Sequence, residues 1–236
     1  MASFFLHSRI SHRASRFASR IPLCIAHPAS RNLYSGSRTS NLISSAALFL
    51  LLTLPVPAEA HLVNTGLGPF YDGVSHLFIA PEDLLVVLAL GLLAGLGGPQ
   101  HGRVVLFSLT GAWIAGGLVG LTHTREIAFP LGTMVSFVVA GALVALDRKL
   151  PLAAILAFST LLGLLHGWLN GTAMIANNSG WLGLVGVSAS VFVLAALLAA
   201  FVVWLQSTWA RIGVRVAGSW IVAIGLLMVG WTVRMK

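Results

Sequence analysis

Six apolar segments, each bounded by loop signals, occupy most of this chain after its first third. They lie near residues 83–98, 104–121, 128–146, 151–173, 181–205 and 214–233. A helix needs roughly 20 apolar residues to cross a bilayer core, and these segments approach or reach that length. The boundaries between them carry turn-forming or charged residues, such as Gly97-Gly98-Pro99, Asp147-Arg148-Lys149 and Asn177-Asn178-Ser179-Gly180. The pattern predicts an all-α integral membrane protein, a bundle of six transmembrane helices.

The residues before the first apolar segment divide into three parts. Residues 1–41 are rich in Arg and Ser and contain no acidic residue, which is typical of an organellar presequence or of a reading frame extended beyond its true start, and we expect them to be disordered. Residues 42–60 combine a short apolar core with Ala58-Glu59-Ala60, the pattern of a cleaved secretory signal. An uncleaved first anchor is the alternative. We therefore expect an outer pre-helix segment at 61–82 and the six-helix domain at 83–236.

The composition supports a membrane protein and narrows its partners. The chain is 57% hydrophobic and 8% charged, whereas soluble domains carry roughly 25% charged residues. A formal net charge of +8 raises nucleic acid as a partner, but the basic residues lie in the first 40 positions and in short loops, without an aromatic and basic groove. The sequence therefore predicts the lipid bilayer as a partner and no nucleic acid.

The loops between the apolar segments predict an orientation. With the N-terminus of the six-helix domain outside, the inner loops carry five basic residues: Arg103, Arg148, Lys149, Arg211 and Arg215. The outer loops between segments carry only Arg125, so the distribution follows the positive-inside tendency, although Arg234 and Lys236 then lie outside. We expect a bacterial inner membrane, with an organellar membrane as the alternative.

Glycines at four-residue spacing predict close helix packing. The longest such run is Gly163, Gly167 and Gly171 in the fourth segment. Small residues at this spacing let two helix backbones approach each other in lipid.

The first group of candidate functional residues surrounds the start of the first apolar segment. Glu82 and Asp83 fall in its first turn, and His76 and Asp72 lie upstream at i, i+4 spacing. Acidic residues at a helix N-terminus are also ordinary partners of the helix dipole, which accounts for Glu82 and Asp83 but not for His76 and Asp72. Carboxylates and imidazoles are metal ligands, so the alternative is a divalent-cation site at the outer end of the bundle.

The second group lies within the fourth segment, where His166 and Asn170 are one helical turn apart. Polar side chains within a membrane must find partners, so they either join neighbouring helices by hydrogen bonds or line a path for a polar solute. His61 follows the predicted cleavage site, where its α-amine and imidazole together would chelate a metal ion. His101 is either an inner exit site or a simple loop histidine.

The single cysteine, Cys24, lies in the part expected to be removed, which excludes disulfides, thiolate zinc sites and iron–sulfur clusters from the mature chain. The remaining ligand types suit nickel, cobalt, zinc or manganese better than Cu(I). No hydrolase or phosphate-binding motif is present, and no paired nucleophile and base is recognisable, so we expect no enzymatic activity.

At these residues the chain resembles the HupE/UreJ family, membrane proteins associated with hydrogenase and urease. One family motif has the form H-P-x-x-G-x-D-H-L-L-x-M-x-x-x-G. His76 matches its first His, Glu82 replaces Asp, Asp83 replaces the second His, and Leu84, Leu85 and Gly91 match the remainder. A second motif, H-G-x-x-H-G-x-E, is similar to the stretch from His166 to Ala173, with Asn170 replacing His and Ala173 replacing Glu.

The resemblance implies a divergent nickel permease. In this interpretation Asp72, His76, Glu82 and Asp83 capture the ion, and His166 and Asn170 pass it into the bundle. The transported ion is Ni²⁺, or Co²⁺ or Zn²⁺, and no tightly bound cofactor is expected. The alternative is an accessory protein that holds a metalloenzyme maturation partner or sequesters metal without transport. A homo-oligomer is compatible with both interpretations.

Overall fold

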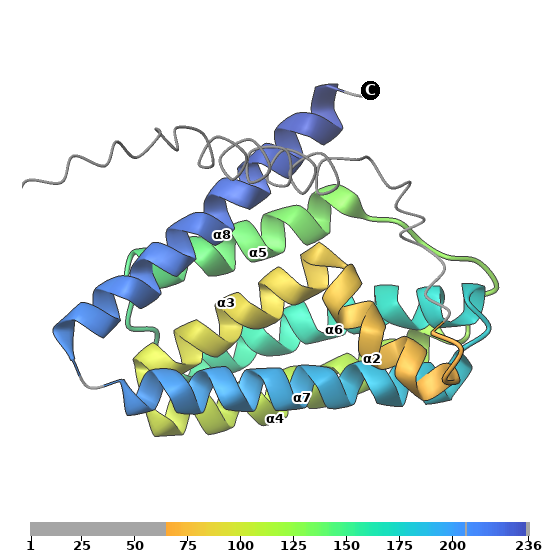
Figure 1. Ribbon diagram of the computed structural model, residues 1–236, viewed down its shortest axis with the longest axis horizontal. Coiled ribbons are helices and arrows are strands. Elements are labelled where there is room, and N and C mark those ends of the chain that lie inside the picture. The colour runs from red at the N-terminus through yellow and green to blue at the C-terminus, as the bar shows by residue number, and fades with distance from the viewer. Residues whose placement is uncertain (1–64, 206, 235–236) are drawn as a thin grey trace, which may run out of the picture. The chain divides into compact units, whose positions relative to one another are not determined.

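The computed structural model describes residues 65–205 and 207–234, and these residues contain helices and no strand. The sequence predictions for 1–41, 42–60 and His61 lie outside the described residues. Within these described residues seven helices follow one another (Figure 1): α2 (Pro69–Ile79), α3 (Pro81–Gly97), α4 (Pro99–Gly120), α5 (Pro130–Ala145), α6 (Leu152–Ala176), α7 (Gly180–Trp204) and α8 (Thr208–Arg234).

Proline marks the beginning of four of these helices: α2, α3, α4 and α5. Proline suits the first helical position because its fixed φ matches the helix and its missing N–H is not needed there. Helices α3 to α8 each coincide with one of the six apolar segments. Helix α2 was not predicted as an element, because its 11 residues mix apolar and polar types and are too few to show a clear apolar period.

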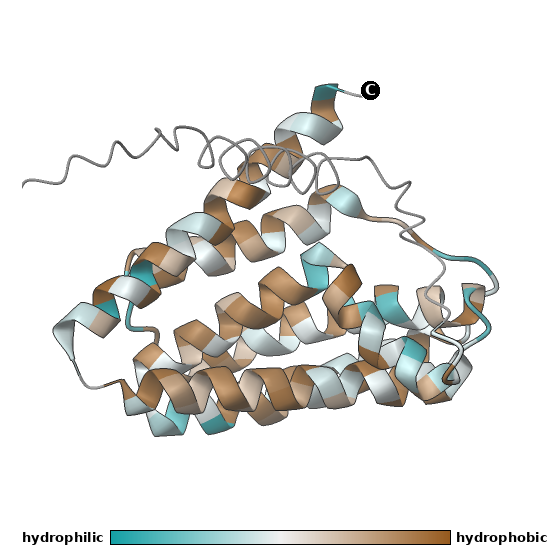
Figure 2. Ribbon diagram, viewed as in Figure 1, coloured by the Kyte–Doolittle hydropathy of each residue, from teal (hydrophilic) through white to brown (hydrophobic). Residues whose placement is uncertain are grey.

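Four helices, α4, α6, α7 and α8, are long and apolar enough to cross a membrane alone. Helices α2 and α3 meet this condition only together and are bent by 75° at their junction, while α5 is a shorter apolar helix of 16 residues. The protein is therefore an integral, multi-pass membrane protein, and its described residues are all-helical with four to five candidate spans. Hydrophobic residues extend along α3 to α8, with hydrophilic ones near the helix ends (Figure 2).

Helices α4 and α6 make the most extensive helix–helix contact among the described residues. A Cβ atom on Gly167 would clash with the carbonyl of Trp113, and one on Gly163 would lie 2.7 Å from the carbonyl oxygen of Leu109. The structure thus confirms the close approach predicted from the glycine run of α6. Helix α7 packs against α2, α3 and α4, while α5 packs against α8 and α3, so α3 has neighbours on several sides.

The connections α3–α4, α5–α6 and α7–α8 meet at one end of this helical unit. There His101 Nε2 is bonded to the carbonyl oxygen of Leu150 at 3.0 Å, and Arg211 is paired with Asp147. The basic residues predicted to lie inside are therefore on or near these connections. The opposite end, where α3 begins, carries the polar groups described next.

Candidate cation site

A buried polar cluster joins the first turn of α3 to the middle of α6. Asp83 Oδ1 lies 2.7 Å from His166 Nδ1, and Asp83 Oδ2 accepts a hydrogen bond from Asn170 Nδ2 at 2.7 Å. The exposed fractions of Asp83, His166 and Asn170 are 4%, 0% and 2%. The helical spacing that places His166 and Asn170 one turn apart lets both reach the same carboxylate. The cluster thus places a carboxyl group, an imidazole and an amide in contact with one another between two helices.

His76 is the fourth member of this cluster and the most accessible one. Its Nε2 lies 3.9 Å from Asp83 Oδ2, and its side chain is 12% exposed. His76 approaches the carboxylate because the chain bends by 75° between α2 and α3. The bend occurs at Ala80. Its extended backbone ends α2, and the proline that follows it starts α3.

Two further side chains fix the ring of His166. Its Nε2 lies 2.8 Å from Ser136 Oγ on α5, and the indole of Trp113 on α4 stacks on the imidazole, with ring centroids 5.7 Å apart. An ionised carboxylate only accepts hydrogen bonds, so with Asp83 in its charged form the Nδ1 of His166 is the donor. Because both ring nitrogens already have partners, His166 orients Asp83 rather than offering a free lone pair.

One acceptor in the cluster has no partner. Asn170 donates through Nδ2 to Asp83 Oδ2 and to the carbonyl oxygen of His166, but its Oδ1 is buried without a hydrogen bond among the described residues. Leaving a buried acceptor unpaired costs roughly 1–3 kcal/mol. The amide that is bonded to the carboxyl group therefore keeps an oxygen lone pair that could serve a cation, as carboxylate oxygens also do.

The structure places the other predicted site residues apart from this cluster. Asp72 accepts hydrogen bonds from the backbone N–H and the hydroxyl of Thr65, both at 2.7 Å. Glu82 is half-buried in the first turn of α3, and no contact joins it to His166 or Asn170. Adjacent residues on a helix lie about 100° apart, so only one of Glu82 and Asp83 is directed into the bundle.

The part of the chain that the structure describes contains no group of three His, Cys, Asp or Glu side chains arranged to hold a metal ion. A cation at Asp83 would therefore also depend on the amide of Asn170 and on movement of His76. At the other end of the unit, the bond from His101 to the Leu150 carbonyl gives that histidine the role of tying α4 to the α5–α6 loop.

The sequence analysis did not identify Ser136 and Trp113. Ser136 had a recognisable signal, because a polar residue within a predicted span is expected to face the bundle interior. No sequence signal distinguished Trp113 from the other six tryptophans. Their hydrogen bond and ring contact depend on helix rotation, which the sequence pattern does not define.

Comparison with known proteins identifies one family. The profile described as HupE / UreJ protein matches residues 48–228, which is most of the chain. No curated protein and no solved structure matches. The match includes both segments that form the buried cluster, and the chain belongs to the HupE / UreJ family.

Proposed function

We propose that this protein is a membrane permease for a divalent transition metal, with Ni²⁺ as the first candidate and Co²⁺ and Zn²⁺ as alternatives. Its family suggests a nickel or cobalt transport or accessory role. The observation that carries the proposal is the buried carboxyl group of Asp83 bonded to the side chain of Asn170, whose Oδ1 makes no hydrogen bond among the described residues. A buried negative charge with an adjacent vacant acceptor is expensive for a hydrophobic bundle unless the site serves a cation.

In this proposal α3 to α8 provide six membrane crossings, with α2 folded at the outer end and the preceding segment cleaved as a signal. The positive-inside distribution supports this orientation, since the basic residues gather at the α3–α4, α5–α6 and α7–α8 connections. The short α5 crosses by locally thinning the bilayer or by drawing its flanking polar residues toward the interface. A bacterial inner membrane remains our expectation.

In this proposal each side chain of the cluster has a different role in cation transfer. His76, the most exposed member, exchanges part of the hydration shell of the ion for its imidazole. Asp83 supplies the negative charge that a dication needs in a low-dielectric environment, and Asn170 supplies a neutral oxygen. His166, held by Ser136 and Trp113, keeps the carboxylate in position. Asp72 and Glu82 lie at the same end but outside the cluster, and the proposal gives them no part in binding the ion.

The incomplete ligand set agrees with transport rather than storage. A conducting site must bind an ion well enough to draw it from water and weakly enough to release it. A preassembled set of three or four strong ligands would hold a transition metal tightly. A site with one carboxylate, one amide and one mobile imidazole is suited to transient capture.

The contacts of Ser136, His166 and Asp83 follow the order found in serine hydrolases. We propose no hydrolase activity for this arrangement. Ser136 is 7% exposed and its hydroxyl also lies 2.6 Å from the carbonyl oxygen of Thr133, which holds it within its own helix. A nucleophile needs access to its substrate, whereas this hydroxyl supports a buried ring.

The proposal is tested by Ni²⁺ accumulation in sealed vesicles that contain the full chain and a trapped metal indicator. Asp83→Asn keeps the shape of the site and removes its charge, and we expect uptake to fall by at least about tenfold, equivalent to ~1.4 kcal/mol of lost stabilisation. His76→Ala should also lower uptake. Glu82→Gln is the matched control, because it removes a neighbouring carboxylate outside the cluster, and uptake should change by less than about twofold, since screened surface charges act weakly.

Equal uptake by Asp83→Asn and the unsubstituted protein would refute the proposal. Three of the four side chains of the cluster are almost fully buried, which limits access for an ion. This burial favours the alternative, an accessory protein that does not transport metal. It predicts that the protein binds Ni²⁺ in detergent, in an Asp83-dependent manner, while vesicles accumulate none.

A further inference from the structure

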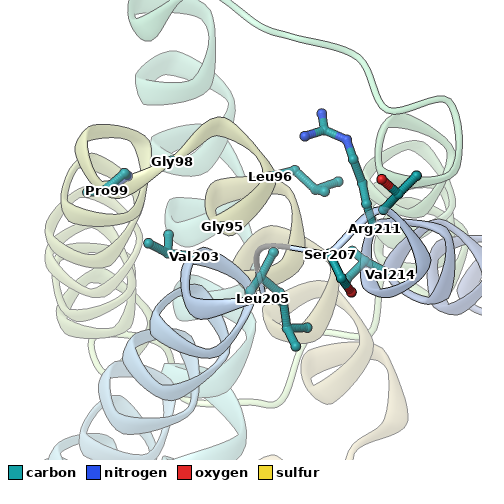
Figure 3. Close-up of a pocket in the computed structure, with 11 residues that line it drawn as sticks. Gly95, Leu96, Gly98, Pro99, Val203, Leu205, Ser207, Arg211 and Val214 are labelled. Carbon is teal, nitrogen blue, oxygen red and sulfur yellow. The ribbon is translucent and has the colours of Figure 1, made fainter. Parts of the chain in front are cut away.

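A second feature of the molecule lies at the opposite end from the cation cluster. A cavity of about 410 Å³ opens between the end of α3 and the α7–α8 connection. Pro99 and Val203 lie on one side of it and Arg211 on the other, with Leu96 and Leu205 between them (Figure 3). This volume is within the usual range for ligand pockets. The cavity thus combines an apolar wall with a cationic edge.

Arg211 retains donors for a ligand. It gives hydrogen bonds from Nε and Nη2 to the two carboxylate oxygens of Asp147, each at 2.7 Å. A guanidinium has five N–H donors, so three are left after this pair forms. The side chain of Arg211 is 43% exposed, so these donors are accessible.

The charge around Arg211 is positive. The positive charges of Arg211, Arg215 and Lys149 all act on the carboxylate of Asp147, so three basic side chains lie near one acidic side chain. Arg215 gives one hydrogen bond, from Nε to the carbonyl oxygen of Ala145 at 3.1 Å, and is itself exposed. This local excess of positive charge favours an anion and opposes a metal cation, so the cavity is not suited to be an exit site for the transported ion.

The depth of the cavity indicates where its ligand comes from. Arg211 lies in the first turn of α8, and Leu96 lies at the end of α3, so the cationic edge and the apolar wall are both at the same end of the membrane-crossing segments. Basic pockets between helices at this level bind the headgroups of anionic lipids. A free phosphate ion would use the guanidinium but gain nothing from Leu96 and Leu205.

We propose that this cavity binds an anionic phospholipid, with its phosphate at Arg211 and the first part of an acyl chain against Leu96 and Leu205. The lipid stabilises the junction of α3, α7 and α8 on the basic side of the membrane. This site is independent of cation transport, because it shares no residue with the Asp83 cluster.

The test uses the full-length protein in a neutral detergent, with native mass spectrometry as the readout. The protein is offered phosphatidylglycerol and phosphatidylcholine with identical acyl chains. We expect preferential retention of one phosphatidylglycerol molecule, and Arg211→Gln should weaken it by at least about fivefold, the factor that corresponds to loss of one basic contact near a membrane surface. Addition of inorganic phosphate should not displace the lipid.

Asp147→Asn is the matched control, because it also breaks the ion pair but releases the two Arg211 donors that Asp147 holds. Retention of phosphatidylglycerol should be unchanged or stronger in this variant. Equal losses in Arg211→Gln and Asp147→Asn would show that the ion pair is only structural and would overturn the proposal. Equal retention of the two lipids by the unsubstituted protein, or displacement by phosphate, would overturn it without any variant.

Discussion

The pairing of Asp83 with His166 makes a quantitative prediction about stability. In His166→Ala the buried carboxylate keeps Asn170 as a donor but loses a 2.7 Å hydrogen bond, and the stack on Trp113 disappears. A buried group that loses a hydrogen-bond partner costs roughly 1–3 kcal/mol, and more when it is charged, so we expect a cost of about 3 kcal/mol or more. Asp83→Asn preserves shape while weakening two charge-assisted hydrogen bonds, so we expect a smaller cost of about 1–3 kcal/mol.

The variant that carries both Asp83→Asn and His166→Ala distinguishes a hydrogen bond to a charged carboxylate from a hydrogen bond between neutral groups. Once Asp83 is Asn, no buried charge is left unpaired when His166 is removed, so the two costs should fall short of additivity by about 1.5–2 kcal/mol. Neutral hydrogen bonds between helices in membranes couple by only about 0.6 kcal/mol on average, because the unfolded chain in the membrane also finds partners. The size of the coupling therefore reports the charge of the pair.

The coupling is obtained from reversible unfolding in mixed detergent micelles, monitored by circular dichroism. Four proteins are compared: the unsubstituted protein, the two single variants and the double variant. Glu82→Gln is the control and should cost no more than about 1 kcal/mol, the value of a charge at a helix N-terminus. Costs that add within about 0.5 kcal/mol would refute the reasoning, because Asp83 and His166 would then stabilise the bundle independently.

Two other predictions concern packing and pH. Gly167→Ala should destabilise the protein by about 1–3 kcal/mol through overpacking at the α4–α6 contact, whereas Gly111→Ala, whose added methyl meets open space, should be neutral or slightly stabilising in the same unfolding assay. Arg211 lowers the pKa of Asp147 below its ordinary value of 3.8, chiefly through their hydrogen bond. Because the folded pKa is depressed, this stabilisation is present above the ordinary pKa and is lost as the pH falls through the lower folded value. It is worth at most about 1 kcal/mol, since both side chains are partly exposed. The difference in unfolding free energy between the unsubstituted protein and Asp147→Asn should therefore begin to shrink at about pH 4 and disappear only below the lowered folded pKa, and a difference that does not shrink as the pH falls below 3.8 would contradict the assignment.

The sequence by itself determined the class of this protein and the positions of its main helices. Apolar runs near the length of a bilayer core define helical segments regardless of how those segments pack, because lipid requires every backbone group to be paired within its own helix. The scarcity of ionisable residues likewise made Asp83 and His166 stand out, since an isolated charge in such a setting needs a partner. The glycine run of α6 predicted close packing for a similarly local reason.

Tertiary structure alone decided which of these residues meet. Glu82 and Asp83 are equivalent by composition and position, yet the rotation of α3 directs only Asp83 toward α6. Helix α2 approaches the site because of the bend at Ala80, which brings His76 to the carboxylate while Asp72 remains with Thr65. The convergence of side chains depends on helix rotation and crossing, and these follow from the packing of whole surfaces rather than from any short segment of sequence.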